Sequence, residues 1–163
     1  MTLKLTPDQR KAKDLIAGDA RYIELRGGAR SGKTVLLIDT TLKRAMAAKK
    51  SRHLISRFRA NALSSIFGPS GTFFFVLKEN FPPEVAERTK HNGEKGYYIL
   101  PNAAEIWYGG LDDQARVDKL LGNEYATILV NEASQVPYGS FTTIITRLAQ
   151  NAPRDDGEGF LRQ

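Results

Sequence analysis

One segment constrains this chain more than any other: residues 27–34, Gly-Gly-Ala-Arg-Ser-Gly-Lys-Thr, fit G-x-x-x-x-G-K-[ST], the phosphate-binding P-loop. The run Tyr22–Arg26 before it alternates in polarity and predicts a short strand. Apolar side chains recur at helical spacing after it, at Val35, Ile38 and Leu42. Strand, glycine-rich loop and helix together form a cradle of backbone N–H groups and a positive helix end. The sequence therefore predicts a nucleoside triphosphate site, and the alternative is a glycine turn that only happens to end in Lys-Thr.

Each position of the motif has an expected role. Lys33 would reach the β- and γ-phosphates, and the Thr34 hydroxyl would help to hold Mg²⁺. The expected cofactors are ATP and Mg²⁺. The candidate nucleotide-binding residues in this segment are Gly28, Ala29, Arg30, Ser31, Gly32, Lys33 and Thr34.

A second chemical feature follows the apolar run 126–130, which predicts a buried parallel strand. The strand ends in Asn131 and Glu132, where P-loop enzymes place an acidic residue for Mg²⁺ and a glutamate that polarises water. Asn131 keeps an oxygen for the metal shell but has no charge, so we expect weakened metal binding. Glu132 is the predicted base. A rival acidic pair, Asp112-Asp113, is less favoured because two glycines separate it from its strand.

The N-terminal helix is predicted to begin at Thr6, with Pro7 in its first turn, and to end at Gly18. Gln9 lies three residues after the cap, which is typical of a capping box. Its amide could also pair with an adenine edge. Spacing favours the cap, and both roles stay open at this point. Ala12, Leu15 and Ile16 are the predicted buried stripe of this helix.

Periodicity and turn residues predict the remaining elements. Strand 53–58 should lie parallel to the P-loop strand, because a helix connects them. The other expected elements are helices over 60–67, 112–121 and 138–150, and a β-hairpin of 97–100 with 105–108. The apolar run 72–78 fits either a buried strand or a buried helix, and a helix is favoured. Residues 151–163 are polar and are expected to form a loop or frayed tail.

Composition limits the class of protein. The chain has 163 residues, no cysteine and no apolar run that approaches ~18 residues, which predicts one domain without disulfides and without a membrane partner. The net charge of +6 is uneven, with +10 in residues 1–60 and −4 in the remainder. A basic N-terminal third suits a polyanion such as nucleic acid, although some of this charge can serve the triphosphate.

Four features follow one another along the chain: Gln9, the P-loop, the hairpin that runs into Tyr108–Asp112, and Val130–Ala133. In this order they resemble the N-terminal ATPase domain of the large terminase subunit of tailed bacteriophages. The likeness covers nearly all of residues 5–150, and Arg30 at the fourth position of the P-loop is its most specific part.

This resemblance implies a RecA-like P-loop fold, with a mostly parallel sheet flanked by helices and a β-hairpin insertion. It implies a motor that packages double-stranded DNA into a procapsid, as a homo-oligomeric ring on the portal protein, with a small terminase subunit as partner. The location would be the cytoplasm of the bacterial host and transiently the procapsid. By the same resemblance Gln9 would contact adenine, Arg30 would stabilise the γ-phosphate and Glu132 would be the catalytic glutamate. Lys33 is also a candidate catalytic residue. An arginine from a neighbouring subunit is also expected, with Arg147 and Arg116 as candidates.

Two family parts are not found in the sequence: the ribonuclease-H-like nuclease, and the strand that follows the glutamate strand. We therefore expect a partial ATPase domain over 1–150, incomplete at its C-terminal side, that does not cut DNA. Alternatives are a helicase-like DNA-dependent ATPase and a truncated nucleotide-binding remnant without turnover.

Overall fold

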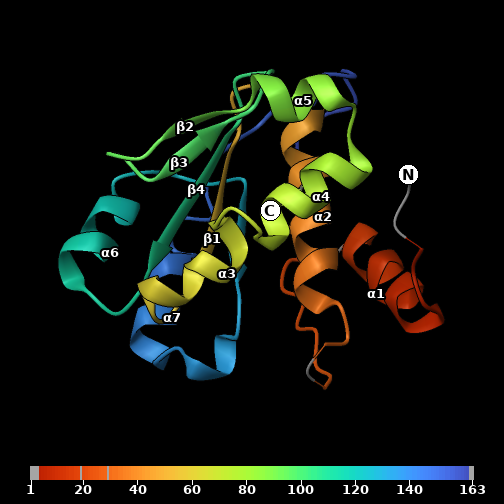
Figure 1. The fold of residues 1–163 in the computed structure, drawn as a ribbon. Coiled ribbons are helices and arrows are strands. Elements are labelled where there is room, and N and C mark those ends of the chain that lie inside the picture. The colour runs from red at the N-terminus through yellow and green to blue at the C-terminus, as the bar shows by residue number, and fades with distance from the viewer. Residues whose placement is uncertain (1–3, 19, 29, 162–163) are drawn as a thin grey trace.

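A mixed five-stranded sheet with helices on both faces forms the centre of the molecule (Figure 1). The computed structural model describes residues 4–18, 20–28 and 30–161. The strands lie in the order β2-β3-β4-β1-β5, and their bounds are β1 (Arg52–Arg57), β2 (Lys90–Asn92), β3 (Tyr97–Ile99), β4 (Glu105–Gly110) and β5 (Thr127–Val130). β1 pairs in parallel with β4 and β5, whereas β2-β3 and β3-β4 are antiparallel.

The α/β class is thus confirmed, but the prediction of a mostly parallel sheet is wrong. The predicted hairpin is present as β3 and β4. It is not a separate insertion, because β4 also pairs with β1 and so joins the antiparallel strands to the parallel ones. The prediction missed β2, which extends this antiparallel part by one short edge strand.

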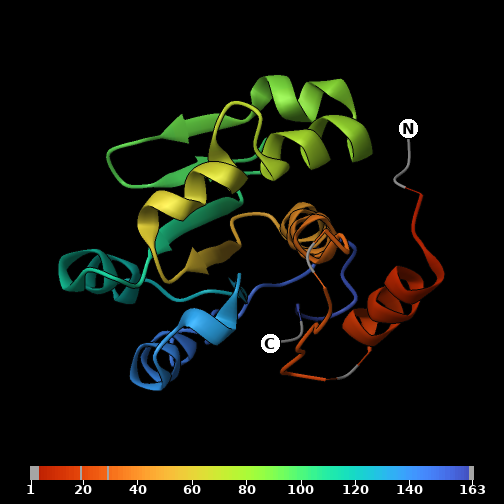
Figure 2. The same ribbon diagram turned by 60° about the horizontal axis from the view of Figure 1, so that its bottom comes forward.

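Two helical layers cover the sheet (Figure 2). One face packs against α2 (Lys33–Ala47), η1 (Ala60–Leu63), α3 (Ser64–Phe67), α4 (Thr72–Asn80) and α5 (Pro83–Arg88). The other packs against α6 (Gln114–Leu121) and α7 (Tyr138–Ile145), which follows the short helix η2 (Ala133–Gln135). Side chains alternate between the two faces along a strand, so neighbouring residues of β1 belong to different hydrophobic clusters. Ile55 packs on the face covered by α2 and α4, and Leu54 packs on the face covered by α6 and α7.

The apolar stretch 60–80 meets the length and composition expected of a membrane-crossing helix. The core helices of globular domains meet the same criteria. Here the stretch is divided among η1, α3 and α4, with breaks near Gly68 and Gly71. Phe73, Val76 and Leu77 are fully buried against the sheet, and the predicted helix over 72–78 is confirmed.

The strand predicted before the P-loop is absent, since residues 23–28 have no regular secondary structure. β5 is the edge strand on this side of the sheet, and among the described residues no strand pairs with its outer side. A hollow of about 180 Å³ lies between residues 22–26 and β5, and Ile23 and Val130 are among the residues that line it. An extended segment without a neighbour cannot form ladder hydrogen bonds, and its polarity pattern alone does not make it a strand.

Helix α1 (Pro7–Ala17) begins as predicted, with Thr6 as N-cap and Gly18 as C-cap, and with both bonds of the capping box. The predicted buried stripe is wrong. α1 has no buried residue, and Leu15 is 64% exposed. The helix lies beside α2 without reaching the sheet (Figure 2), and so its apolar side is only partly covered.

The loop 151–161 is docked on the end of α2. The N–H of Asp155 donates to the Ala47 carbonyl at 2.9 Å, and its carboxylate accepts from the Lys49 N–H at 3.1 Å. Ala152 and Leu161 are buried in a small cluster with Ala48 and Ala126. The segment lacks helices and strands, yet it belongs to the packed structure.

Candidate nucleotide-binding site

The P-loop turns sharply into α2 at Gly32, which caps the helix in the left-handed region with φ of 81°. A side chain would be strained at this φ, and an added Cβ would lie 2.3 Å from Nε2 of Gln9. Gln9 occupies this space because its Nε2 donates to the Ser31 carbonyl at 2.9 Å. Glycine is therefore required both by the turn and by the close approach of α1.

Lys33, the first residue of α2, folds back over its own loop. Its ammonium Nζ donates to the carbonyls of Gly27 at 2.7 Å and Gly28 at 2.8 Å, and to the Ser31 hydroxyl at 3.0 Å. The positive charge thus lies at the cradle predicted to hold phosphate, where carbonyl and hydroxyl oxygens are its partners. Phosphate oxygens would be stronger acceptors for the same group.

The loop and the end of β5 meet through one hydrogen bond. The Thr34 hydroxyl donates to Oδ1 of Asn131 at 3.1 Å, although the two residues are 97 positions apart in sequence. Asn131 is 8% exposed, and its N–H donates to the Ser56 carbonyl at the end of the neighbouring strand. The two residues predicted to serve Mg²⁺ are therefore adjacent. The rival Asp112 instead accepts from the N–H of Ala60, at the start of η1.

Thr34 and Asn131 each bring a neutral oxygen atom to this corner that could be a ligand for a cation. Mg²⁺ prefers oxygen ligands and usually keeps several waters, so the donor types fit. Among the described residues, no group of three or more His, Asp or Glu side chains could hold a metal. This corner would therefore need the phosphates to complete a metal site.

The carboxylate of Glu132 is held by Arg57, whose Nη2 donates to Oε2 of Glu132. Glu132 has left-handed backbone angles (φ 55°, ψ 50°), which turn the chain sharply after β5. Arg57 ends β1 and also donates to the Ala62 carbonyl at 3.2 Å, in η1. Arg57 was not among the predicted site residues, and its place beside Glu132 depends on β1 and β5 being neighbours in the sheet, which the sequence did not predict.

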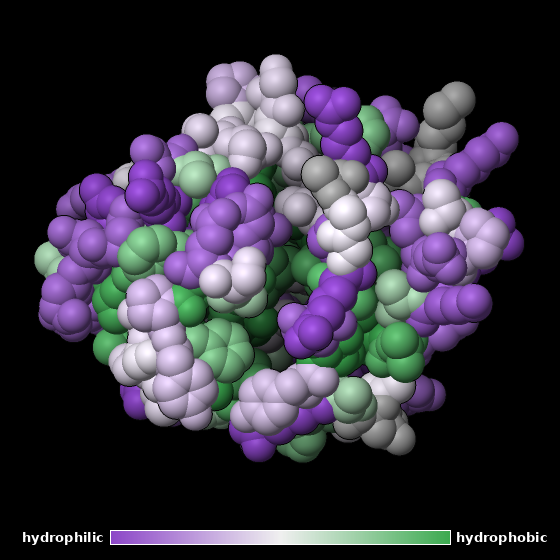
Figure 3. Space-filling view, turned by 90° about the horizontal axis from the view of Figure 1, so that it is seen from below, coloured by the Kyte–Doolittle hydropathy of each residue, from purple (hydrophilic) through white to green (hydrophobic). Residues whose placement is uncertain are grey.

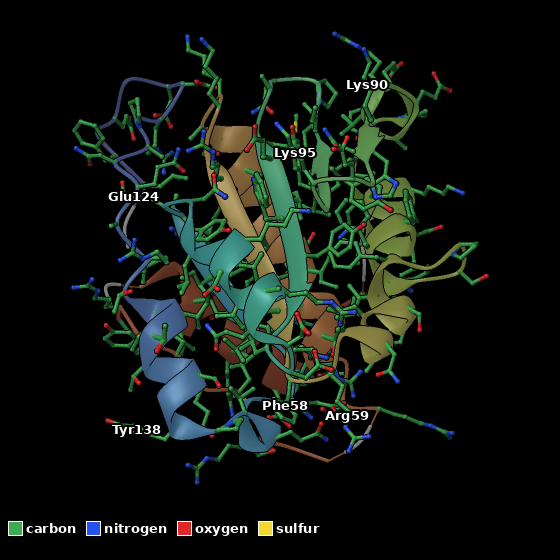
Figure 4. All side chains as sticks on the ribbon, turned by 90° about the vertical axis from the view of Figure 1, so that its left-hand side faces the viewer. Phe58, Arg59, Lys90, Lys95, Glu124 and Tyr138 are labelled. Carbon is green, nitrogen blue, oxygen red and sulfur yellow. The ribbon has the colours of Figure 1, made fainter. Side chains whose placement is uncertain are left out.

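These groups gather at one end of the molecule. Figure 4 shows Phe58 and Arg59, which follow Arg57, and Tyr138, which begins α7, at the same lower end, with Lys90 and Lys95 at the opposite end. Figure 3 shows this lower face directly; it is hollowed near its middle, with hydrophobic side chains visible between hydrophilic ones. The carboxyl ends of parallel strands are where α/β sheets bind ligands.

The predicted arginines have different surroundings. Arg30 is exposed, with a left-handed φ of 60°. Arg147 is partly buried, and its side chain donates to Thr146 and to the Leu121 carbonyl. Nη1 of Arg116, on α6, lies 3.6 Å from Oδ1 of Asp112, which precedes the helix. Ala29 lies outside the described residues.

Comparisons with known proteins identify the family and the fold of the chain. The family model of the terminase large subunit, T4likevirus-type, N-terminal, matches residues 25–155. No curated protein matches the chain. Among solved structures, the chain is similar to the large terminase from a thermophilic bacteriophage, with a TM-score of 0.69 and 14% identity. The similarity covers 91% of this chain and 37% of that one, and at this identity it concerns the fold. The chain thus belongs to the T4likevirus-type terminase large-subunit family and matches the N-terminal part of its members.

Proposed function

We propose that this chain is the ATP-hydrolysing motor region of a large terminase subunit, with a RecA-like arrangement, which drives double-stranded DNA into a procapsid. One observation supports this most directly: the Thr34–Asn131 bond joins the P-loop to the strand end that carries Glu132, in a chain of the terminase family. Nucleotide chemistry in P-loop enzymes needs these two elements side by side.

Each residue has a role in this proposal. Lys33 exchanges its carbonyl partners for the β- and γ-phosphates, and the N-terminus of α2 adds positive potential. Arg30, exposed on the loop, stabilises charge on the γ-phosphate. Thr34 and Asn131 would hold a Mg²⁺ ion that neutralises phosphate charge. Gln9, already bonded to the P-loop, contacts the adenine.

Glu132 orients the attacking water for in-line displacement at the γ-phosphate. Its carboxylate is engaged by Arg57, so the described conformation corresponds to a resting state. Hydrolysis requires that the carboxylate turn from the guanidinium toward the cradle. Arg57 is thus a positioning residue rather than a catalytic one.

The proposal is tested with Lys33→Ala, which should abolish both ATP binding and hydrolysis, and Glu132→Gln, which should retain binding but stop turnover. Lys78→Ala, at an exposed lysine on α4, is the matched control and should behave as wild type. Undiminished hydrolysis by Glu132→Gln would remove the assignment of the base. ATP titration without phosphate release by the wild-type chain would favour the remnant alternative, to which the uncharged Asn131 already points.

The partners belong to the same proposal. Double-stranded DNA is the substrate, and the portal protein, the small terminase subunit and further copies in a ring are the assembly partners. The motor would act in the bacterial cytoplasm and on the procapsid, without a membrane partner. DNA-stimulated hydrolysis together with strand separation, and no association with portal protein, would favour the helicase-like alternative instead.

A further inference from the structure

The side-chain amide of Gln9 is held from two sides. Its Oε1 accepts from the N–H of Thr6 at 2.9 Å, and its Nε2 donates to the Ser31 carbonyl at 2.9 Å. The amide thus bridges the first turn of α1 and the P-loop. Gly32 leaves the room for this contact, since an added Cβ would lie 2.3 Å from Nε2. One side chain therefore links the start of α1 to the nucleotide site.

The two partners fix the orientation of this amide. The oxygen and nitrogen ends of a glutamine have nearly the same shape, so hydrogen-bond partners decide which end lies where. The Thr6 N–H is a donor and is matched by Oε1, whereas the Ser31 carbonyl is an acceptor and is matched by Nε2. A donor on one side and an acceptor on the other allow a single orientation.

The amide keeps enough hydrogen-bonding capacity for a ligand. A glutamine amide has two N–H groups and an oxygen with two lone pairs, and these two contacts use one of each. One N–H and one lone pair remain. A donor and an acceptor on one amide are what an adenine edge requires. Gln9 can therefore meet a base without leaving Thr6 or Ser31.

The place of Gln9 depends on the cap of α1. The Gln9 N–H donates to Oγ1 of Thr6 at 3.3 Å, which completes the capping box. α1 has 11 residues and no buried residue, and helices shorter than about 12–15 residues are marginal in water by themselves. Loss of the cap should therefore fray the first turn, which carries Gln9.

We propose that Thr6 is a positioning residue of the nucleotide site, because its capping box holds the Gln9 amide where it meets the base. Thr6 acts through Gln9 and does not contact the nucleotide itself. This inference rests on the proposed function, in which Gln9 contacts the adenine. A cap with only a structural role would stabilise α1 without changing how the site distinguishes ATP from a triphosphate that has no base.

Isothermal titration calorimetry with ATP and with inorganic tripolyphosphate tests the proposal, because the second ligand has the phosphates without the base. Thr6→Ala removes the cap hydroxyl and should weaken ATP binding about two- to five-fold. Tripolyphosphate should bind as it does to the wild type. Thr6→Pro also removes the N–H that Oε1 accepts from, at a φ of −67° that proline adopts, and should weaken ATP binding at least about five-fold.

Two variants should behave as wild type. Thr6→Ser keeps both the hydroxyl and the N–H, and Lys13→Ala changes an exposed position of α1 outside the capping box. Circular dichroism establishes that each variant is folded, and Thr6→Ala decides the test if Thr6→Pro unfolds.

The outcomes separate this inference from the proposed function. Unchanged ATP affinity in Thr6→Ala would overturn the inference, as would equal weakening of both ligands, which would place the damage in the P-loop. A wild-type chain that binds both ligands equally well would overturn it together with the adenine contact of Gln9. ATP binding that depends on Thr6 but leads to no hydrolysis would support the inference and overturn only the motor activity.

Discussion

Replacing Arg57 by alanine isolates the contact that holds Glu132 in its described position. Nη2 of Arg57 donates to the Glu132 carboxylate, and Nη1 donates to the Ala62 carbonyl at 3.2 Å. The Arg57 side chain is 16% exposed and that of Glu132 is 42% exposed, so water reaches the acidic partner. The substitution frees the carboxylate while leaving the P-loop contacts of Lys33 intact.

The structure bounds the size of the effect. An ion pair with one well-exposed partner is worth about 1 kcal/mol or less, because solvent screens it. If hydrolysis must first break this pair, its loss lowers the barrier by that amount. A change of about 1.4 kcal/mol is tenfold in rate, so about 1 kcal/mol corresponds to roughly five-fold faster basal hydrolysis.

Steady-state phosphate release at saturating ATP and Mg²⁺ measures this prediction. Arg59→Ala, at the exposed arginine two residues further along, is the matched control and should leave the basal rate unchanged. Urea unfolding of each variant separates a change in rate from a change in the folded fraction. A fall of kcat to the level of Glu132→Gln would refute the reasoning, because Arg57 would then assist the chemistry instead of holding the base back.

Three further substitutions address the remaining features. Gly32→Ala should lower the stability of the fold by about 1 kcal/mol because of the left-handed backbone alone. It should also weaken ATP binding, measured by calorimetry, because the added methyl displaces Gln9. The control Gly28→Ala, whose methyl meets nothing within 4 Å, should keep wild-type stability. Asn131→Asp should lower the Mg²⁺ concentration for half-maximal hydrolysis by about ten-fold, roughly 1.4 kcal/mol for the added charge, and an unchanged Mg²⁺ dependence would speak against a metal role. Burial, and then the charge of Arg44, lower the pKa of His53 to about 3 from 6.5, so the unfolded chain binds the proton first as the pH falls. Stability should therefore fall by about 1.4 kcal/mol for each pH unit of acidification between those values, and His53→Gln should remove this slope from urea midpoints measured at several pH values.

The sequence by itself determined the local chemistry of the site. A P-loop is recognisable because its glycines, lysine and threonine are neighbours, and the capping box of Thr6 and Gln9 is equally local. The run 126–130 was recognisable as a strand that ends in the polar pair Asn131–Glu132, although only Leu129 of β5 is buried, because the strand lies at the edge of the sheet. These features depend on spacing within a few residues, which one chain displays in full.

Only the tertiary structure decided which distant groups became neighbours. The pairing of Glu132 with Arg57 depends on which strands are adjacent in the sheet, and no local pattern records that. The run 22–26 alternates like a strand but stays irregular, because a strand requires a partner for its backbone. Leu15 has helical spacing but stays exposed, because burial requires an opposing surface as well as an apolar stripe. Spacing therefore predicts what a segment can form, whereas its partners decide what it does form.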